Sequence, residues 1–152
     1  KHCKQNKISF FAYYLHKAGF KNVFICDWAE APLLDFHKKL PGFPKHHLLH
    51  ADFFELKKHT YDYIIEQTFF CALNPNLRPK YASKMKELLC DGGRLVGLLF
   101  NFPLTETGPP FGGSKEEYLN YFNPCFNKVS IEPCYNSIEP RFGTEYFIKM
   151  KK

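Results

Sequence analysis

The chain has 152 residues, a net charge of +6 at pH 7 and an apolar fraction of 45%, with 17 phenylalanines. This length fits one domain with a core of its own, and so apolar and aromatic a composition excludes a disordered chain. The basic residues are scattered rather than clustered, so we expect them on the surface, with neither nucleic acid nor a membrane as partner.

The first third of the chain predicts two helices separated by a short strand. Residues 7–18 carry apolar side chains at helical spacing, and Gly19 is a typical C-terminal stop. The apolar run 22–26 predicts a strand that ends at Asp27. Residues 28–40 then predict a second helix, which a Pro-Gly pair ends.

The middle of the chain alternates strands with a helix. We expect strands at 47–51, 61–67 and 94–100, a helix at 78–89, and a turn at the Asp-Gly-Gly sequence 91–93. The strand after this turn is apolar on both faces, which is typical of a parallel sheet covered by helices.

The last third begins with a loop rich in glycine and proline, residues 105–113. Ser114 is a favourable N-cap for a helix that reaches Phe122. Residues 128–132 and 145–150 are suited to an antiparallel pair of strands. The whole order predicts an α/β fold, a Rossmann-like, doubly wound, mostly parallel sheet with an antiparallel C-terminal strand.

Ligands of such sheets bind beyond the carboxyl ends of the strands. Asp27 follows the first predicted strand; it can hold the two hydroxyls of a ribose, or cap the next helix. Asp52 and Phe53 follow the next strand; they can hold an adenine, or form a surface turn with Phe53 or Phe54 in the core. Glu66 ends the third strand; it can face a sulfonium or an amine, or pair with an arginine or lysine.

Cysteine and histidine chemistry is not expected. The six cysteines form no CxxC pair, so we expect reduced thiols, no metal and a cytoplasmic protein. Cys71 stands in no nucleophile motif, and we reject it as a nucleophile. We expect His46, His47 and His50 to be solvated rather than metal ligands. No signal peptide and no apolar run long enough to span a membrane is present.

Several ordered motifs resemble the thiopurine S-methyltransferase and thiocyanate methyltransferase family. They are Asp52–Leu56, Tyr61–Leu73, Arg78-Pro79 with Tyr81 and Met85, Glu87–Leu89, Gly92–Leu95, Gly108–Phe111 and Ser137–Arg141 with Gly143 and Glu145. The resemblance implies a seven-stranded methyltransferase fold, S-adenosylmethionine as methyl donor, and a small soft nucleophile such as a thiol, thiocyanate or halide as acceptor. It also implies direct displacement at the sulfonium methyl. Because such a reaction depends mainly on the positioning and orientation of the two reactants, no catalytic residue is assigned.

The same resemblance assigns site residues by position. The cofactor-binding set comprises Asp27 at the ribose with Trp28 next to it, Asp52 and Phe53 around the adenine, and Glu66 and Gln67 beside the methionine part. The acceptor set comprises Phe111, Tyr135 and Arg141, for which the alternatives are a packed loop aromatic, a core tyrosine and a surface salt bridge. The acceptor is expected to be a small molecule and the protein a monomer.

The chain departs from the family at its start. The family's first strand ends in a glycine-rich turn, whereas Lys1–Lys7 contains neither a glycine nor an apolar strand. We expect one domain over residues 1–152 that is incomplete at its N-terminus; a novel loop is another explanation. The alternative function is a degenerate methyltransferase-like binding or scaffold protein. A nicotinamide-dependent oxidoreductase is disfavoured, because no GxGxxG fingerprint occurs.

Overall fold

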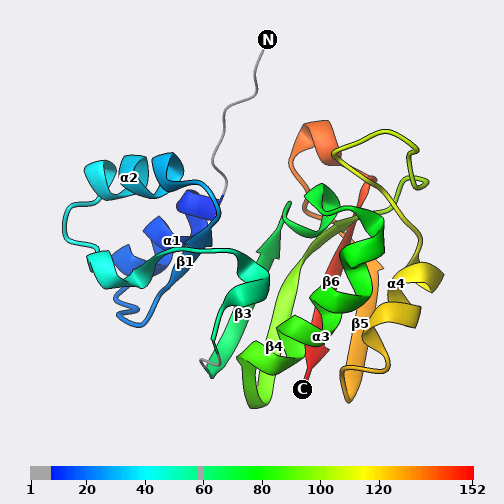
Figure 1. The fold of residues 1–152 in the computed structure, drawn as a ribbon. Coiled ribbons are helices and arrows are strands. Elements are labelled where there is room, and N and C mark those ends of the chain that lie inside the picture. The colour runs from blue at the N-terminus through cyan, green and yellow to red at the C-terminus, as the bar shows by residue number, and fades with distance from the viewer. Residues whose placement is uncertain (1–7, 58–59) are drawn as a thin grey trace. The chain divides into compact units, whose positions relative to one another are not determined.

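The computed structural model describes residues 8–57 and 60–152 (Figure 1). The glycine-free segment Lys1–Lys7 lies outside the described residues. The chain forms two compact units, residues 1–56 and 57–152. The structure determines each unit separately, so one domain over residues 1–152 stays a prediction.

The first unit is a small parallel sheet with two helices. Its elements are α1 (Ile8–Lys17), β1 (Ile25–Asp27), α2 (Glu30–Lys39) and β2 (Leu48–His50), with the 3-10 turns Lys45–His47 and Phe53–Glu55. β1 and β2 are parallel, and Asp27 lies opposite His50 in their register. The buried core of this unit consists of Ala12, Ile25, Leu33, Phe36, Leu40 and Phe43.

The end of α1 confirms the stop predicted at Gly19. Gly19 has a φ of +94°, and its N–H donates to the His16 carbonyl at 3.1 Å. The N–H of Phe20 reaches back to the Leu15 carbonyl, also at 3.1 Å. This pair of bonds is a Schellman motif, which favours glycine because other residues are strained at positive φ.

The second unit is a four-stranded sheet with the order β3-β4-β6-β5 (Figure 1). Its elements are β3 (Tyr61–Gln67), α3 (Arg78–Leu88), β4 (Leu89–Phe100), α4 (Lys115–Phe122), β5 (Lys128–Pro133) and β6 (Glu145–Lys151), with the 3-10 turns Phe70–Ala72, Pro75–Leu77 and Glu139–Arg141. β3 is parallel to β4, while β6 is antiparallel to both β4 and β5. The predicted mostly parallel sheet with an antiparallel C-terminal strand is confirmed.

One face of this sheet is packed against helices. Glu66 points from β3 to the buried Tyr81 on α3, and α3 in turn contacts α4. Tyr63 and Ile65 alternate with Glu66 along β3 and are exposed. At the carboxyl ends of β3 and β4, one face of the sheet is therefore covered by α3 and the loops next to it.

Two predicted boundaries are wrong. The first strand covers 25–27 instead of 22–26, because Ile25, Cys26 and Asp27 are the residues that pair with β2. The Asp-Gly-Gly sequence is no turn but lies within β4, where Leu89 pairs with Tyr61 and Arg94 with Tyr63. The three extra residues on β4 form a bulge, which Gly92 permits by its φ of +79°.

The expectation of solvated histidines fails for His47. This side chain is buried, and its ring centroid lies 4.0 Å from that of Phe24. Burial is the main cause that lowers the pKa of His47. His47 therefore belongs to the packing of the first unit, where a neutral ring behaves as an aromatic side chain.

Candidate functional site

The first unit has a recess at the carboxyl ends of its two strands. A cavity of about 220 Å³ is lined by Trp28, His50, Ala51 and Asp52. Because β1 and β2 are parallel, the residues that follow them meet at one edge of the sheet, as predicted. Two of the predicted cofactor residues, Trp28 and Asp52, thus line one cavity.

Asp27 and Asp52 each use one carboxylate oxygen locally. Oδ1 of Asp27 accepts the Ala29 N–H at 2.9 Å, just before α2, and Oδ1 of Asp52 accepts the Phe54 N–H at 2.8 Å. Within the described part of the chain, the second oxygen of each carboxylate has no hydrogen-bond partner. Both carboxylates are therefore fixed by their own backbone, with one oxygen left to bind a ligand.

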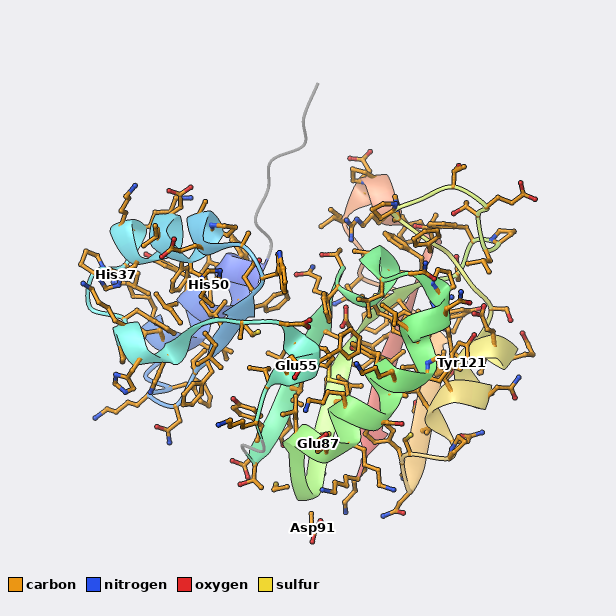
Figure 2. The ribbon with its side chains drawn as sticks, viewed as in Figure 1. His37, His50, Glu55, Glu87, Asp91 and Tyr121 are labelled. Carbon is orange, nitrogen blue, oxygen red and sulfur yellow. The ribbon has the colours of Figure 1, made fainter. Side chains whose placement is uncertain are left out.

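His50 is a residue of the recess that the sequence analysis did not assign. Its Nε2 lies 3.0 Å from the Trp28 carbonyl oxygen, to which it donates when the proton is on Nε2 (Figure 2). This bond links the end of β2 to the residue after β1. The signal in the sequence was its place two residues before Asp52, at a predicted strand end.

Trp28 and Phe53 supply the aromatic surface of this region. The Trp28 side chain is 74% exposed, an unusual state for the largest apolar side chain. Phe53 is half-buried and contacts Phe54 edge to face, with ring centroids 5.2 Å apart. The surface turn of the alternative is present as the 3-10 turn Phe53–Glu55, but neither Phe53 nor Phe54 is fully buried.

In the second unit, Glu66 holds the turn that follows β3. Oε1 of its carboxylate accepts the N–H groups of Phe69 and Phe70 at 2.9 and 3.0 Å, and Oε2 accepts the Tyr81 hydroxyl. The side chain is buried, and this burial raises the pKa of Glu66. Its partners are thus a tyrosine and two amides, not the arginine or lysine considered from sequence.

Gln67 is the next residue along the chain, and its side-chain carbonyl oxygen is an unused hydrogen-bond acceptor. Its Oε1 is buried and has no hydrogen-bond partner among the described residues. The next residue, Thr68, has a φ of +65°, which is uncommon for a residue other than glycine. A buried carbonyl oxygen without a donor is costly, and such an atom is a reason to look for a ligand.

Cys71 interacts with two of the predicted acceptor residues, Phe111 and Arg141. Its carbonyl oxygen accepts the Phe111 N–H at 2.7 Å. Burial first, and then the charge of Glu66, raise the pKa of the Cys71 thiol to about 11, while the charge of Arg141 lowers it. The thiol is therefore protonated at neutral pH, which agrees with its rejection as a nucleophile.

Phe111 and Arg141 are both anchored. The Phe111 ring lies over Gly108, where an added Cβ would be 2.8 Å from ring carbon Cδ1. The Arg141 guanidinium donates from Nη1 to the buried Glu145 carboxylate at 3.0 Å and lies 5.1 Å from the Phe100 ring centroid. Its other nitrogens have no partner in the described ranges, so the guanidinium keeps donors for a ligand.

Tyr135 differs from the other acceptor candidates. Its side chain is 87% exposed in the connection between β5 and β6, so the alternative of a core tyrosine is wrong.

The described residues contain no group of three or more His, Cys, Asp or Glu arranged to hold a metal ion. No helix in residues 8–57 or 60–152 has the length and hydropathy needed to cross a membrane.

Comparison with known sequences gives consistent matches. The family described as Thiopurine S-methyltransferase (TPMT) matches residues 30–147. The Probable thiol methyltransferase 2 of Arabidopsis thaliana is 36% identical over 115 residues, which are 74% of this chain and 51% of that protein. Thiocyanate methyltransferase 1 of Brassica oleracea is 35% identical over 103 residues, 66% of this chain and 46% of that protein. The chain thus spans about half the length of these relatives.

Solved structures share the fold at low sequence identity. A putative O-methyltransferase from Nostoc punctiforme matches with a TM-score of 0.68 and 16% identity, over 94% of this chain and 48% of its own. The 1,6-didemethyltoxoflavin-N1-methyltransferase of Burkholderia thailandensis, solved with S-adenosylhomocysteine, matches with a TM-score of 0.66 and 14% identity. That match covers 92% of this chain and 64% of the other. These likenesses establish the methyltransferase-type α/β fold.

Proposed function

The chain belongs to the thiopurine S-methyltransferase family, and on this basis we propose that it takes part in S-adenosylmethionine-dependent methyl transfer to a small soft nucleophile. The relatives named for thiol and thiocyanate methyl transfer support this acceptor class. The proposal includes a cytosolic, monomeric protein whose acceptor is a small molecule, with no part for nucleic acid or a membrane.

The observation that carries the proposal is the recess at the ends of β1 and β2. Asp52 and Trp28 line it, and Asp27 ends β1 beside it. Its volume of about 220 Å³ is below the roughly 300 Å³ at which ligand pockets begin, so it suits one part of a nucleoside. We propose that the free oxygen of Asp27 binds the ribose hydroxyls.

The adenine would then lie against Asp52, Phe53 and Trp28. The free oxygen of the Asp52 carboxylate can accept from the exocyclic amino group, and the two aromatic rings offer faces for stacking. Trp28 supports this assignment best, because so large an exposed apolar ring gains from covering by a flat ligand.

Gln67 and Glu66 are proposed beside the methionine part. The unpaired Oε1 of Gln67 is an acceptor that an ammonium group can satisfy. Glu66 has both oxygens in bonds to its own chain, so its proposed part is to hold the turn that carries Gln67. The residues present therefore fit this end of S-adenosylmethionine.

When bound, S-adenosylmethionine would supply a methyl group to the soft nucleophile, which bonds to the methyl carbon as the carbon–sulfur bond breaks and S-adenosylhomocysteine leaves. The residues of this chain need only orient and bind, since such a nucleophile is already ionised or weakly protonated. We propose that Arg141, held by Glu145, attracts an anionic acceptor, with Phe111 as an aromatic wall. We also propose the exposed Tyr135 as part of the acceptor site.

The test is methyl transfer by the purified chain to thiocyanate and to a small thiol, measured as product and as S-adenosylhomocysteine. Product formation with both supports the proposal. The alternative is a degenerate scaffold. It predicts no product and no rise in melting temperature with S-adenosylhomocysteine.

A further inference from the structure

Arg78 is a fully buried charge at the first position of α3. Its side chain has no exposed surface, although arginine is among the residues least often buried. Nη1 donates to the Glu117 carboxylate at 2.8 Å, and the guanidinium lies 4.7 Å from the Phe70 ring centroid. A buried charge is stable only when it is paired, so the way Arg78 is paired indicates what it does.

The second terminal nitrogen of the guanidinium, Nη2, binds the loop that joins β4 to α4. Nη2 donates to the carbonyl oxygens of Gly112 at 2.8 Å and of Phe111 at 3.4 Å. Arg78 therefore connects the start of α3 to the very residue proposed as the acceptor's aromatic wall. We call residues 101–113 the acceptor loop.

The acceptor loop is anchored at both ends and exposed along its middle. Residues 103–110 are exposed, whereas Gly112 and Gly113 are buried. At its start, Asn101 donates from its N–H to the Thr144 carbonyl at 3.0 Å and from Nδ2 to the Gly143 carbonyl at 3.1 Å. Near its end, the Phe111 N–H donates to the Cys71 carbonyl, and Arg78 donates to the Phe111 and Gly112 carbonyls. Among the described bonds from outside the loop to Phe111 and Gly112, only those of Arg78 come from a side chain, so a substitution can remove them alone.

Glu117 makes this anchor specific for arginine. The Tyr121 hydroxyl donates to the same Glu117 oxygen at 3.0 Å, so the carboxylate is held from α4 while it pairs with Arg78 (Figure 2). Arginine spans the carboxylate and the two carbonyls because its guanidinium carries several donors in a fixed plane. A lysine has a single side-chain nitrogen and cannot bind both the Glu117 carboxylate and the loop carbonyls in this geometry.

We propose that Arg78 is the positioning residue of the acceptor loop: it fixes the backbone of Phe111 and Gly112 and thereby sets the affinity for the methyl acceptor. This inference rests on the proposed function. Arg78 itself does not touch the acceptor, and its bonds are made to the loop backbone and to Glu117. Among the described residues, Arg78 makes no hydrogen bond to the lining of the recess or to Glu66 and Gln67, so cofactor affinity is expected to be independent of Arg78.

The experiment uses the full chain with R78K and R78M, and K84A as the matched control on α3. Lys84 makes a surface ion pair with Glu87 at 3.1 Å, away from the loop. Three quantities are measured: the KM for thiocyanate, the Kd for S-adenosylhomocysteine, and the rate of chymotrypsin cleavage within residues 101–113. R78K is the milder change and keeps the comparison possible if R78M does not fold.

The expected result for R78K is a KM about tenfold higher and loop cleavage about tenfold faster, the factor for one charge-assisted hydrogen bond, with an unchanged Kd. K84A is expected to match the parent in all three. An unchanged KM and cleavage rate overturns the inference, as does an equal loss of acceptor and cofactor binding, which indicates a merely structural role. If the parent chain shows no methyl transfer, the proposed function fails, and loop cleavage alone decides whether Arg78 anchors the loop.

Discussion

Tyr81 and Glu66 form a buried hydrogen bond that links α3 to the end of β3. Both side chains are almost completely buried, and Glu66 binds the N–H groups of Phe69 and Phe70 with its other oxygen. One carboxylate thus fixes the turn that carries Gln67. Three residues before Tyr81 on the same helix, Arg78 holds the acceptor loop. The first turn of α3 therefore anchors both segments that contribute to the proposed site of the second unit.

Replacing Tyr81 by phenylalanine is expected to destabilise the second unit. The change removes the hydroxyl and leaves one oxygen of a buried carboxylate without its donor, which costs about 1–3 kcal/mol or more for a charged group. Urea denaturation measures the free energy of unfolding. Tyr63→Phe is the control, because Tyr63 is an exposed residue of β3. Equal stability of the two variants would show that the bond has no energetic weight.

Glu66 is expected to make stability depend on pH in an unusual direction. Its folded-state pKa is raised from 4.5, mainly by burial, so the folded chain binds this proton more tightly than the unfolded chain. The stability it contributes is present below pH 4.5 and is lost as the pH rises through the raised folded-state value. Glu66→Gln keeps the shape of the side chain without titrating.

The measurement is the difference in unfolding free energy between the parent and Glu66→Gln at a series of pH values. We expect the parent to lose stability relative to this variant as the pH rises above about 4.5, and the difference to level off above the folded-state pKa. A difference that is constant with pH, or that changes in the parent's favour, refutes the raised pKa of Glu66.

Cys71 is expected to react slowly with alkylating agents at neutral pH. With a pKa of about 11, only about one thiol in ten thousand is ionised at pH 7. Iodoacetamide labelling followed by peptide mass analysis measures each cysteine, and the partly exposed Cys125 serves as internal reference. Labelling of Cys71 should increase up to about pH 11. Labelling at pH 7 as fast as at Cys125 contradicts the account.

Trp28 is the chain's single tryptophan and lines the recess, so its fluorescence reports on that site directly. Titration with S-adenosylhomocysteine should change the emission in a saturable way, because stacking or burial of the indole alters its surroundings. Trp28→Phe should abolish the signal while binding persists. Binding seen by calorimetry without any change in emission would place the ligand away from Trp28.

His50 provides a separate test of the same recess. His50→Ala removes the bond to the Trp28 carbonyl and frees the residue after β1. We expect weaker binding of S-adenosylhomocysteine by up to about tenfold, the value of one hydrogen bond. His37→Ala, a change on α2 outside the recess, is the control. Identical affinity in both variants would remove His50 from the site.

The sequence was sufficient where a pattern is local. The bounds of β3, the Gly19 stop and the Ser114 cap are all set by neighbouring residues, and each was predicted correctly. The strand ends at Asp27 and Asp52 followed from the rule for parallel sheets. The resemblance to a known family added the cofactor and the acceptor class, which no local pattern of this chain contains.

The sequence was insufficient where the outcome depends on packing between distant residues. The Asp-Gly-Gly sequence has the composition of a turn, yet it lies in a bulge within β4, because Leu89 before it and Arg94 after it both pair with β3. The partner of Glu66 is a tyrosine 15 positions away, and that of Arg78 is a glutamate 39 positions away. Such pairs become visible only once the helices are in place.

The central claim is that Asp27 and its neighbours hold the nucleoside of S-adenosylmethionine, and calorimetry with S-adenosylhomocysteine tests it most directly. We predict saturable binding to the parent chain and, for Asp27→Ala, a Kd at least about tenfold higher, because a charged hydrogen-bond acceptor is lost. Asp35→Ala on the exposed side of α2 should bind as the parent does. No heat of binding at millimolar ligand, or an unchanged Kd for Asp27→Ala, would contradict the claim.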